Sequence, residues 1–255
     1  DRLIESRLMQ ASPMRQIATV RQTSAGTYRK PIALGLGADW ATETQSRVES
    51  FTQGFSLLEF PAGELYAMPA ATQALLEDSL ADMDEWLAEE VETAFSIQES
   101  MAFINGDGVG KPKGILEYPI VSESSHSWGR IGSVDGDFSQ SSAGDQLIDL
   151  IHTPKSQFRT NGRFVMNRRT AETVRKQKDG DGRYIWSKST NGNDASVLGY
   201  PVTEIDFRRG YLITDRQGAR VLRDPFTLKP YVLFYTTKRV GGGVQNFDAI
   251  KLMVF

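Results

Sequence analysis

The stretch TQALLEDSLADMDEWLAEEVETAFSIQESMAFI, residues 72–104, decides how the rest of the chain is arranged. Apolar side chains recur in it every three or four positions, which predicts one long amphipathic helix. Thr72 suits the N-cap, and the following Asn105-Gly106-Asp107-Gly108 suits the end, because glycine adopts left-handed dihedrals without strain. The predicted apolar stripe consists of Leu76, Leu80, Met83, Leu87, Val91, Ala94, Ile97, Met101 and Ile104.

The length of this helix sets the shape that we expect for the chain. At 1.5 Å per residue, it would extend about 50 Å. A compact globule of this chain length has a radius of gyration of about 18 Å, so the helix alone is about as long as such a globule is wide. We therefore expect an elongated subunit rather than a single sphere.

The polar side of the predicted helix is acidic, with no lysine or arginine between residues 72 and 104. Such a run is usually a solvated face, but like charges repel along a helix. We expect a basic partner to relieve this repulsion, either elsewhere in the chain or in a second copy of it. The acidic residues are Glu77, Asp78, Asp82, Asp84, Glu85, Glu89, Glu90, Glu92 and Glu99.

The overall composition excludes several classes of protein. Of 255 residues, 40% are hydrophobic and 24% are charged, which is typical of a folded chain of one or two domains. The net charge of -3 argues against a strongly basic nucleic-acid-binding protein. The absence of cysteine excludes disulfides, thiolate catalysis and cysteine zinc sites. No apolar run is long enough for a membrane helix and no signal peptide is visible, so we expect no membrane partner.

The N-terminal region predicts an arm followed by a long hairpin. Residues 1–22 are rich in arginine, and we interpret them as a basic arm. Residues 28–36 and 55–60 are predicted to be extended, and Trp40 lies in the polar connection between them. A two-stranded hairpin with so little apolar alternation cannot form its own core, so we expect it to lie on another surface. The first residue is Asp1 rather than Met, so we expect either a trimmed chain or the product of a processing cut.

The segment after the long helix, INGDGVGKPKGI at residues 104–115, is glycine-rich and contains two lysines. A phosphate-binding loop needs four residues between its glycine and Gly-Lys, then Ser or Thr, and a preceding strand. Here only three residues separate Gly106 from Gly110, Pro112 follows Lys111, and a helix precedes the segment. We therefore predict a tight turn.

The rest of the chain mixes short helices and strands, which is typical of an α+β fold. Helices are predicted at residues 143–158 and 169–178. The Asp/Gly cluster at 179–182 lacks the spacing of a calcium loop, so we predict a turn there. Gly241-Gly242-Gly243 is predicted to break the run that begins with the strand at residues 231–235. Strands are predicted at residues 164–166, 197–202, 210–214, 219–222, 231–235 and 249–255.

Side chains that could catalyse a reaction do not converge in this sequence. His126 lies in a serine-rich segment and His152 at the end of a helical pattern, and neither has the spacing of a metal-binding pair. No G-x-S-x-G nucleophile elbow is present. We predict no catalytic, cofactor-binding or metal site, and we interpret the chain as a protein that is not an enzyme.

Several motifs occur together in a characteristic order. The most specific are Asn105-Gly106-Asp107-Gly108 at the end of the long helix and Asp181-Gly182-Arg183-Tyr184-Ile185, followed by Gly199-Tyr200-Pro201-Val202. With the basic arm, the hairpin, the acidic helix, the turn through Ile115 and Asn167-Arg168-Arg169-Thr170, they make the chain resemble the major capsid proteins of tailed bacteriophages. The resemblance covers essentially the whole chain.

This resemblance implies the phage major-capsid fold, an α+β fold with an N-terminal arm, an extended hairpin loop, a peripheral domain on a long spine helix, and an axial domain. On this chain the arm would be residues 1–22 and the hairpin loop residues 23–67. The peripheral domain would take residues 68–117 and 221–246, with the spine helix at 72–104. The axial domain would take residues 118–220 and 247–255.

The resemblance also implies a structural subunit whose copies form pentamers and hexamers and tile an icosahedral shell around packaged double-stranded DNA, without sequence-specific binding. The expected location is a virion or phage-like particle, assembled in the bacterial cytoplasm with a portal, scaffold or maturation protease. Some relatives join subunits through a lysine at the hairpin tip, but residues 37–54 contain none, so we expect a non-covalent shell. The candidate contacts between copies are Arg29, Lys30, Trp40, Arg47, Glu77, Asp78, Glu85 and Glu89.

Other functions remain open from the sequence. The capsid of a gene transfer agent (GTA), a phage-like particle that packages host DNA, belongs to the same class and is not separated from a phage capsid. An encapsulin would enclose protein cargo, and the phage-like turn motif favours a DNA shell instead. A dimeric enzyme or ligand-binding protein would use the long helix as a strut and would need a pocket with convergent polar groups. A nucleic-acid-binding protein is disfavoured by the net negative charge.

Overall fold

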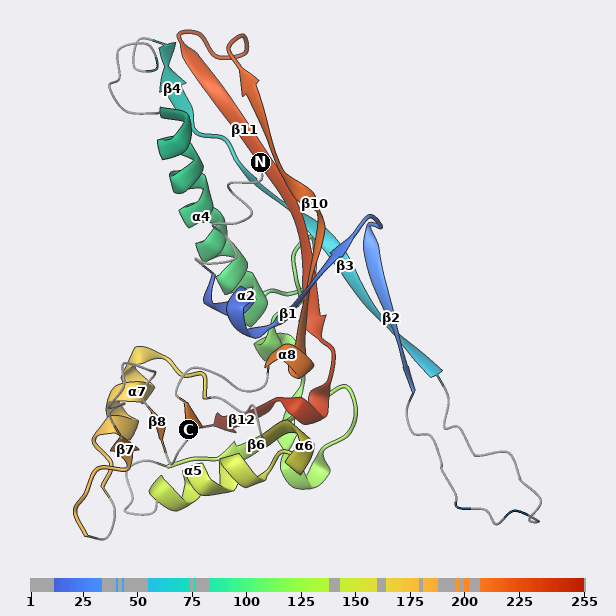
Figure 1. Cartoon of the computed structure of the whole chain (residues 1–255), viewed down its shortest axis with the longest axis vertical. Coiled ribbons are helices and arrows are strands. Elements are labelled where there is room, and N and C mark those ends of the chain that lie inside the picture. The colour runs from blue at the N-terminus through green and yellow to red at the C-terminus, as the bar shows by residue number, and fades with distance from the viewer. Residues whose placement is uncertain are drawn as a thin grey trace.

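The computed structural model describes residues 12–33, 40, 43, 55–73, 76, 83–137, 143–159, 164–178, 181–187, 196–197, 200–201 and 207–254. A large sheet with one long helix beside it forms the upper part of the subunit, and shorter helices with two small sheets form the lower part (Figure 1). Two strands of the large sheet extend sideways as a hairpin. The mixture of helices and strands confirms the predicted α+β class.

The large sheet has the strand order β1-β10-β11-β3-β2, and β4 pairs with β11 as well. β1 runs parallel to β10, and the other pairs are antiparallel. The two separate strands that we predicted at residues 210–214 and 219–222 form one strand, β10. The strands of this sheet are β1 (Thr19–Thr23), β2 (Thr27–Ala33), β3 (Phe55–Ala67), β4 (Ala70–Thr72), β10 (Tyr211–Asp224) and β11 (Tyr231–Val244).

The glycine run at residues 241–243 does not interrupt the strand, so that prediction was wrong. All three glycines belong to β11 and pair with β10. A Cβ atom on Gly241 would lie 2.6 Å from the carbonyl oxygen of Pro61, and one on Gly243 would lie 3.1 Å from the ring of Phe60. Glycine therefore allows β3 to approach β11 closely. A close approach of a neighbouring backbone is a common reason for glycine inside a strand.

The long helix is α4 (Met83–Asn105), which is 23 residues long. We predicted a helix from Thr72 as its N-cap. Thr72 is the last residue of β4 and pairs with Tyr231, and the next residue, Gln73, is helical, as is Leu76. Residues 74, 75 and 77–82 lie outside the described part of the chain, so a continuous helix from residue 73 to α4 stays a prediction. The predicted end is confirmed, because Asn105 is the last helical residue.

The buried face of α4 differs from the predicted stripe in its lower half. Ile97 and Met101, which we placed on the buried stripe, are 54% and 57% exposed. The buried positions recur every four residues, and each such step advances about 40° around the helix. The buried face therefore winds around α4 as the helix follows a twisted sheet. The buried residues of this series are Leu87, Val91, Phe95, Glu99 and Phe103.

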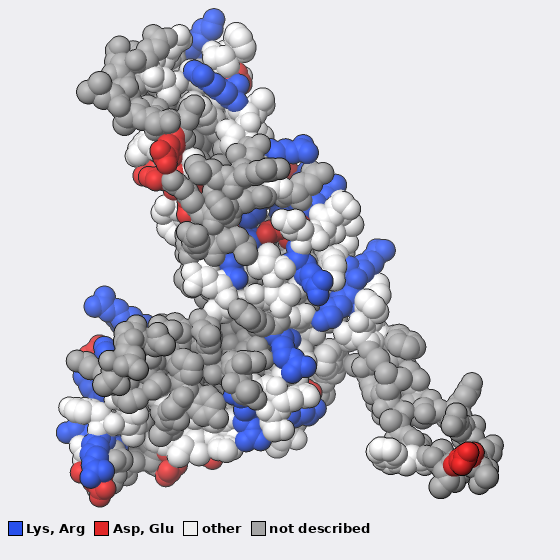
Figure 2. All heavy atoms as spheres, viewed as in Figure 1, with Lys and Arg blue, Asp and Glu red and all other residues white. Residues whose placement is uncertain are grey.

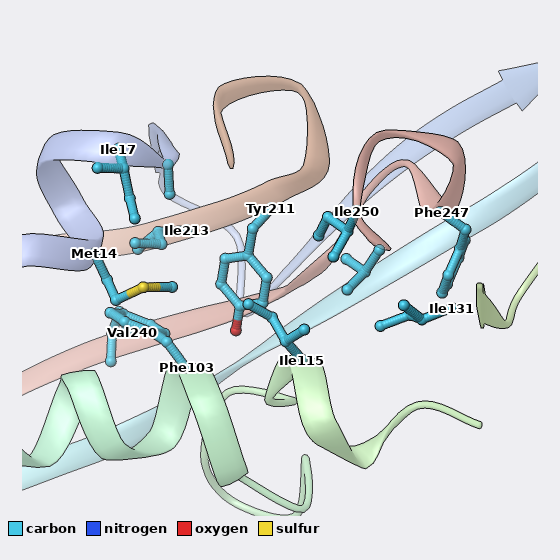
Figure 3. Close-up of a cluster of buried hydrophobic side chains, with 12 residues drawn as sticks. Met14, Ile17, Phe103, Ile115, Ile131, Tyr211, Ile213, Val240, Phe247 and Ile250 are labelled. Atoms are coloured by element: carbon cyan, nitrogen blue, oxygen red, sulfur yellow. The ribbon is translucent and has the colours of Figure 1, made fainter. Parts of the chain in front are cut away.

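The described part of the predicted arm is built into the core of its own subunit. Helix α2 (Pro13–Ile17) has proline in its first turn, where the missing N–H costs nothing. Met14 and Ile17 pack into the main hydrophobic cluster beside Phe103 of α4, Tyr211 of β10 and Val240 of β11 (Figure 3). The chain then continues into β1 at the edge of the large sheet.

The lower part contains a three-stranded parallel sheet of order β12-β6-β5, a second small sheet of order β7-β8-β9, and the short helices. The helix predicted at residues 143–158 is two helices, with Pro154 between them, because proline cannot donate the hydrogen bond that would continue the first. The elements are η1 (Ile115–Glu117), β5 (Ile120–Ser122), η2 (Glu123–Ser125), β6 (Ile131–Asp135), α5 (Ala143–His152), α6 (Ser156–Arg159), α7 (Arg168–Arg175), β7 (Trp186–Ser187), β8 (Ser196–Val197), β9 (Tyr200–Pro201), α8 (Phe207–Gly210), η3 (Phe247–Ala249) and β12 (Lys251–Val254).

Several sequence predictions can be compared with this lower part. The side chain of Asn167 caps α7 by accepting a hydrogen bond from the Thr170 backbone N–H at 2.9 Å. The strand predicted at residues 164–166 is reduced to one bridge position at Phe164. β10 runs without a break across residues 220 and 221, where we placed a domain boundary. The division into arm, hairpin, peripheral and axial parts stays a prediction.

Candidate assembly surface

The turn after α4 is a rigid corner that joins the helix, the large sheet and the lower part. The side chain of Asp107 accepts a hydrogen bond from the Val109 backbone N–H at 2.9 Å, and Gly108 and Gly110 have positive φ angles of 81° and 67°. The backbone N–H of Lys113 donates to the Gly242 carbonyl at 3.0 Å. These contacts confirm the predicted tight turn.

Four charged side chains, three of them buried and Asp215 partly buried, lie where α2, α4, β10 and β11 meet. Arg15 donates from Nε to Glu99 Oε2 at 2.6 Å and from Nη1 to Asp215 Oδ2 at 2.7 Å. Its Nη2 bonds to the second oxygen of each carboxylate, at 2.9 and 2.8 Å. Lys238 Nζ lies 3.1 Å from Glu99 Oε1 and 3.6 Å from Asp215 Oδ1. Two cations therefore balance two carboxylates, and we call these residues the buried charge cluster.

The electrostatics of the buried charge cluster depend on all four members. Arg15, Glu99 and Lys238 are at most 3% exposed. Burial alone would raise the pKa of Asp215, but hydrogen bonds and charge from Arg15, together with the charge of Lys238, outweigh burial and hold this pKa below its ordinary value. Removing one partner of a buried ion pair costs about 3–5 kcal/mol, because the other charge stays buried and uncompensated. The cluster therefore ties the N-terminal segment firmly to the helix and sheet.

Sequence reasoning missed the buried charge cluster, although it contained a signal. We assigned Glu99 to the acidic solvated face and Arg15 to the basic arm. Glu99 lies four residues from Phe95 and four from Phe103, so it falls in line with two aromatic side chains of the same helix face. For Glu99, the expected basic partner is in the same chain.

The structure places Arg29 and Lys30 on β2 and gives each a contact inside the chain. Arg29 Nε lies 2.8 Å from Glu59 Oε1 in an exposed ion pair across the hairpin. Lys30 Nζ donates to Gln245 Oε1 at 2.7 Å. Partial burial and the nearby charge of Arg21 lower the pKa of the Lys30 ammonium. Arg29 is therefore the more accessible of the two for contact with another copy.

The other predicted contact residues are described only in part. Trp40 is fully exposed, and Glu85 and Glu89 are exposed on α4. Arg47, Glu77 and Asp78 lie outside the described residues. Figure 2 shows acidic side chains along the α4 edge of the subunit and basic side chains over the side formed by β10, β1 and β2. In the upper part of the subunit, acidic side chains thus lie mainly on the α4 side and basic side chains mainly on the opposite side, whereas the lower part carries both signs.

Large apolar side chains are also exposed at both the helix and the far end of the sheet. Ile97 and Met101 lie on α4, and Phe226 and Leu228 lie in the turn between β10 and β11. The carboxylate of Asp224 holds this turn by accepting a hydrogen bond from the Phe226 backbone N–H at 2.9 Å. Contiguous apolar patches often mark a surface that a partner covers, so these two places are candidates for contact between copies.

The described residues hold no group of three or more His, Asp or Glu side chains that could bind a metal ion. His126 Nδ1 lies 3.7 Å from Asp248 Oδ1, and His152 Nδ1 lies 2.9 Å from Arg159 Nη1, so each histidine has a local charged neighbour. No helix in the described part of the chain is long and apolar enough to cross a membrane.

The comparisons with known proteins identify the family. The model of the phage capsid family matches residues 1–255. The chain belongs to the phage capsid family. It is therefore a structural capsid subunit, and its location is the shell of a phage or phage-like particle.

Solved capsid structures agree with this family. The capsid of an empty GTA particle, computed with C5 symmetry, is 40% identical to this family member over 96% of this chain and 90% of that chain, with a TM-score of 0.87. The capsid of a native GTA particle is 41% identical over the same shares, with a TM-score of 0.85. The capsid of Myoviridae phage XM1 is 13% identical over 92% of this chain and 89% of that chain, with a TM-score of 0.58, and shows the fold alone. No curated protein matched the sequence.

Proposed function

We propose that copies of this capsid subunit assemble as pentamers and hexamers into an icosahedral shell that encloses double-stranded DNA, and that the subunit catalyses no reaction. The observation that carries this proposal is the likeness to the GTA capsids, at 40% identity and a TM-score of 0.87 over 96% of the chain. The C5 symmetry of those structures supports rings of five copies. Identity to the phage structures is only 13–17%, so a GTA-like particle is favoured over a phage.

The contacts between copies that we propose join the hairpin of one subunit to the acidic helix of the next. The distribution of charge supports this arrangement, because in the upper part of the subunit acidic side chains lie mainly on the α4 side and basic side chains mainly on the opposite side (Figure 2). Arg29 forms an exposed bridge to Glu59, and such bridges contribute about 0–1 kcal/mol, so the partner is easily exchanged. The proposed contact set is Arg29, Lys30, Trp40 and Arg47 against Glu77, Asp78, Glu85 and Glu89.

The other proposed partners follow from the same likeness. A particle that encloses DNA needs an opening through which the DNA enters, so a portal protein is a proposed partner. A scaffold or a maturation protease is the proposed partner during assembly. No contact in the described part of the subunit points to any of these partners, so the likeness to the GTA capsids is their only support.

Nuclease protection of purified particles tests the enclosed DNA directly. Particles that contain this subunit are treated with DNase, the nuclease is inactivated, and the remaining DNA is extracted and sized. We expect double-stranded DNA of uniform length, because a closed shell fixes the volume available. Shells that protect protein but no nucleic acid would contradict the proposal that the shell encloses DNA. The assignment of the chain to the phage capsid family would still hold.

A further inference from the structure

The segment formed by residues 12–23 is attached to the subunit through few elements. β1 lies at the edge of the large sheet, and among the described strands it pairs with β10 alone. Helix α2 contributes Met14 and Ile17 to the core and Arg15 to the buried charge cluster. The pairing of β10 with β11 does not involve this segment. Residues 12–23 can therefore leave the sheet edge while the centre of the sheet stays intact.

The buried charge cluster is balanced only while α2 is in place. With Arg15 docked, two cations face Glu99 and Asp215. Without it, Lys238 is the one remaining member with a positive charge, because its Nζ contacts both carboxylates. Glu99 and Asp215 would then face one ammonium instead of two cations, which leaves one carboxylate without a compensating charge at neutral pH.

We infer that the buried charge cluster is an acid-sensitive latch, which holds residues 12–23 on α4 and β10 at neutral pH and releases them when the medium is acidified. This inference goes beyond the proposed function and does not depend on it. The charged groups that face one another are Arg15 from α2, Glu99 from α4, Asp215 from β10 and Lys238 from β11, and no charged side chain of β1 contacts them among the described bonds.

The direction of the pH dependence follows from the two states. In the docked state, the hydrogen bonds and charge of Arg15 keep the pKa of Asp215 below its ordinary value despite burial. In the undocked state these bonds are lost while Lys238 alone faces both carboxylates, so a carboxylate takes up a proton at a higher pH. The stabilisation of docking is therefore complete above the undocked pKa and is lost as the pH falls through the docked pKa. For one linked proton, the undocking constant rises about tenfold per pH unit within this window.

A single cysteine can report undocking, because the chain contains none. Ser12 is fully buried and its hydroxyl has no hydrogen-bond partner, so Ser12→Cys is nearly isosteric and breaks no hydrogen bond. The matched control is Thr236→Cys on β11, which replaces another buried hydroxyl-bearing side chain. Thr236 is paired with Val221 and Ala67 rather than with β1, so it reports opening of the sheet itself. Labelling with dithiodipyridine is measured in the full-length chain from pH 7.5 to pH 3, because the ordinary pKa of an aspartate is about 4 and the docked pKa of Asp215 lies below it. Each rate is divided by that of the same chain unfolded in denaturant at the same pH.

We expect the Ser12→Cys rate ratio to rise about tenfold per pH unit over at least part of this range, while the Thr236→Cys ratio stays nearly constant. A flat ratio for Ser12→Cys would overturn the latch. So would an equal rise at both positions, because the whole subunit would then be opening.

Charge variants in the Ser12→Cys background separate charge balance from packing. Arg15→Met keeps most of the side-chain length and should raise the rate ratio at pH 7.5 about a hundredfold or more. Adding Asp215→Asn leaves one carboxylate facing Lys238 and should lower the ratio again by about tenfold. Failure of this second substitution to restore protection would contradict a latch based on charge balance. If Arg15→Met does not fold, the pH series on Ser12→Cys alone decides.

Discussion

Gly63 in β3 is the position where the large sheet meets the turn after α4, and its replacement by alanine has a large expected effect. A Cβ atom there would lie 2.0 Å from the carbonyl oxygen of Gly110, 2.5 Å from its carbonyl carbon and 2.8 Å from Cα of Lys111. All three are backbone atoms of the turn, so no flexible side chain can move aside. Ordinary contact distances begin at 3.4 Å, so the turn must shift by about 1.4 Å relative to β3.

The loss of folding free energy caused by that shift can be estimated. Overpacking of a closely packed interior costs about 1–3 kcal/mol and sometimes more. The turn also carries the Lys113 hydrogen bond to Gly242, which the shift would lengthen. One kcal/mol lowers the melting temperature of a chain of this size by about 2–4 °C. We therefore expect Gly63→Ala to lower the melting temperature by at least several degrees.

The measurement is thermal unfolding of the full-length subunit by circular dichroism, with Gly144→Ala as the matched control. Gly144 lies at the start of α5, and a Cβ atom there meets nothing within 4 Å. The control should be neutral or slightly stabilising, because alanine favours a helix over glycine by about 1 kcal/mol. Equal melting temperatures for the two variants would refute the close approach of the turn to β3.

The remaining predictions concern the hairpin and the long helix. The double variant Arg29→Glu/Lys30→Glu should fold with a loss of stability no greater than about 1 kcal/mol and should assemble poorly, whereas Lys176→Glu at the C-cap of α7 should assemble normally. Light scattering of the purified chains measures assembly, and normal assembly of the double variant would remove the hairpin contact. Leu87→Asp should abolish folding because it buries a charge, whereas Ile97→Asp should yield folded subunit, as measured by circular dichroism. Recovery of folded Leu87→Asp would contradict the observed buried face of α4.

The sequence was sufficient to predict the class of fold and the long helix, because these depend on local patterns. Hydrophobic periodicity indicated α4, and the glycines after Asn105 indicated its end and the tight turn. The face that α4 buries could not be predicted, because Ile97 and Met101 continue a plausible apolar stripe. Only the twist of the large sheet selects the neighbouring series that includes Phe95 and Phe103.

Contacts between distant parts of the chain account for the other differences between the predictions and the structure. Gly241 lies in the middle of a strand because β3 approaches it at Pro61, and nothing in the local sequence indicates that approach. Likewise, Arg15 and Glu99 are far apart in the sequence, so the buried charge cluster appears only once α2 packs on α4. For the assembly surface, the sequence identified Trp40 as a candidate contact residue, and the structure shows that it is exposed. The contacts between copies themselves depend on a second subunit.

The central claim is that this capsid subunit closes into shells, and electron microscopy of particles formed by the full-length chain tests it most directly. We predict closed icosahedral shells with five-fold vertices, in which the density of each subunit fits the large sheet, α4 and the lateral hairpin of Figure 1. A monodisperse dimer under every assembly condition would contradict the claim and would return attention to a dimeric ligand-binding protein.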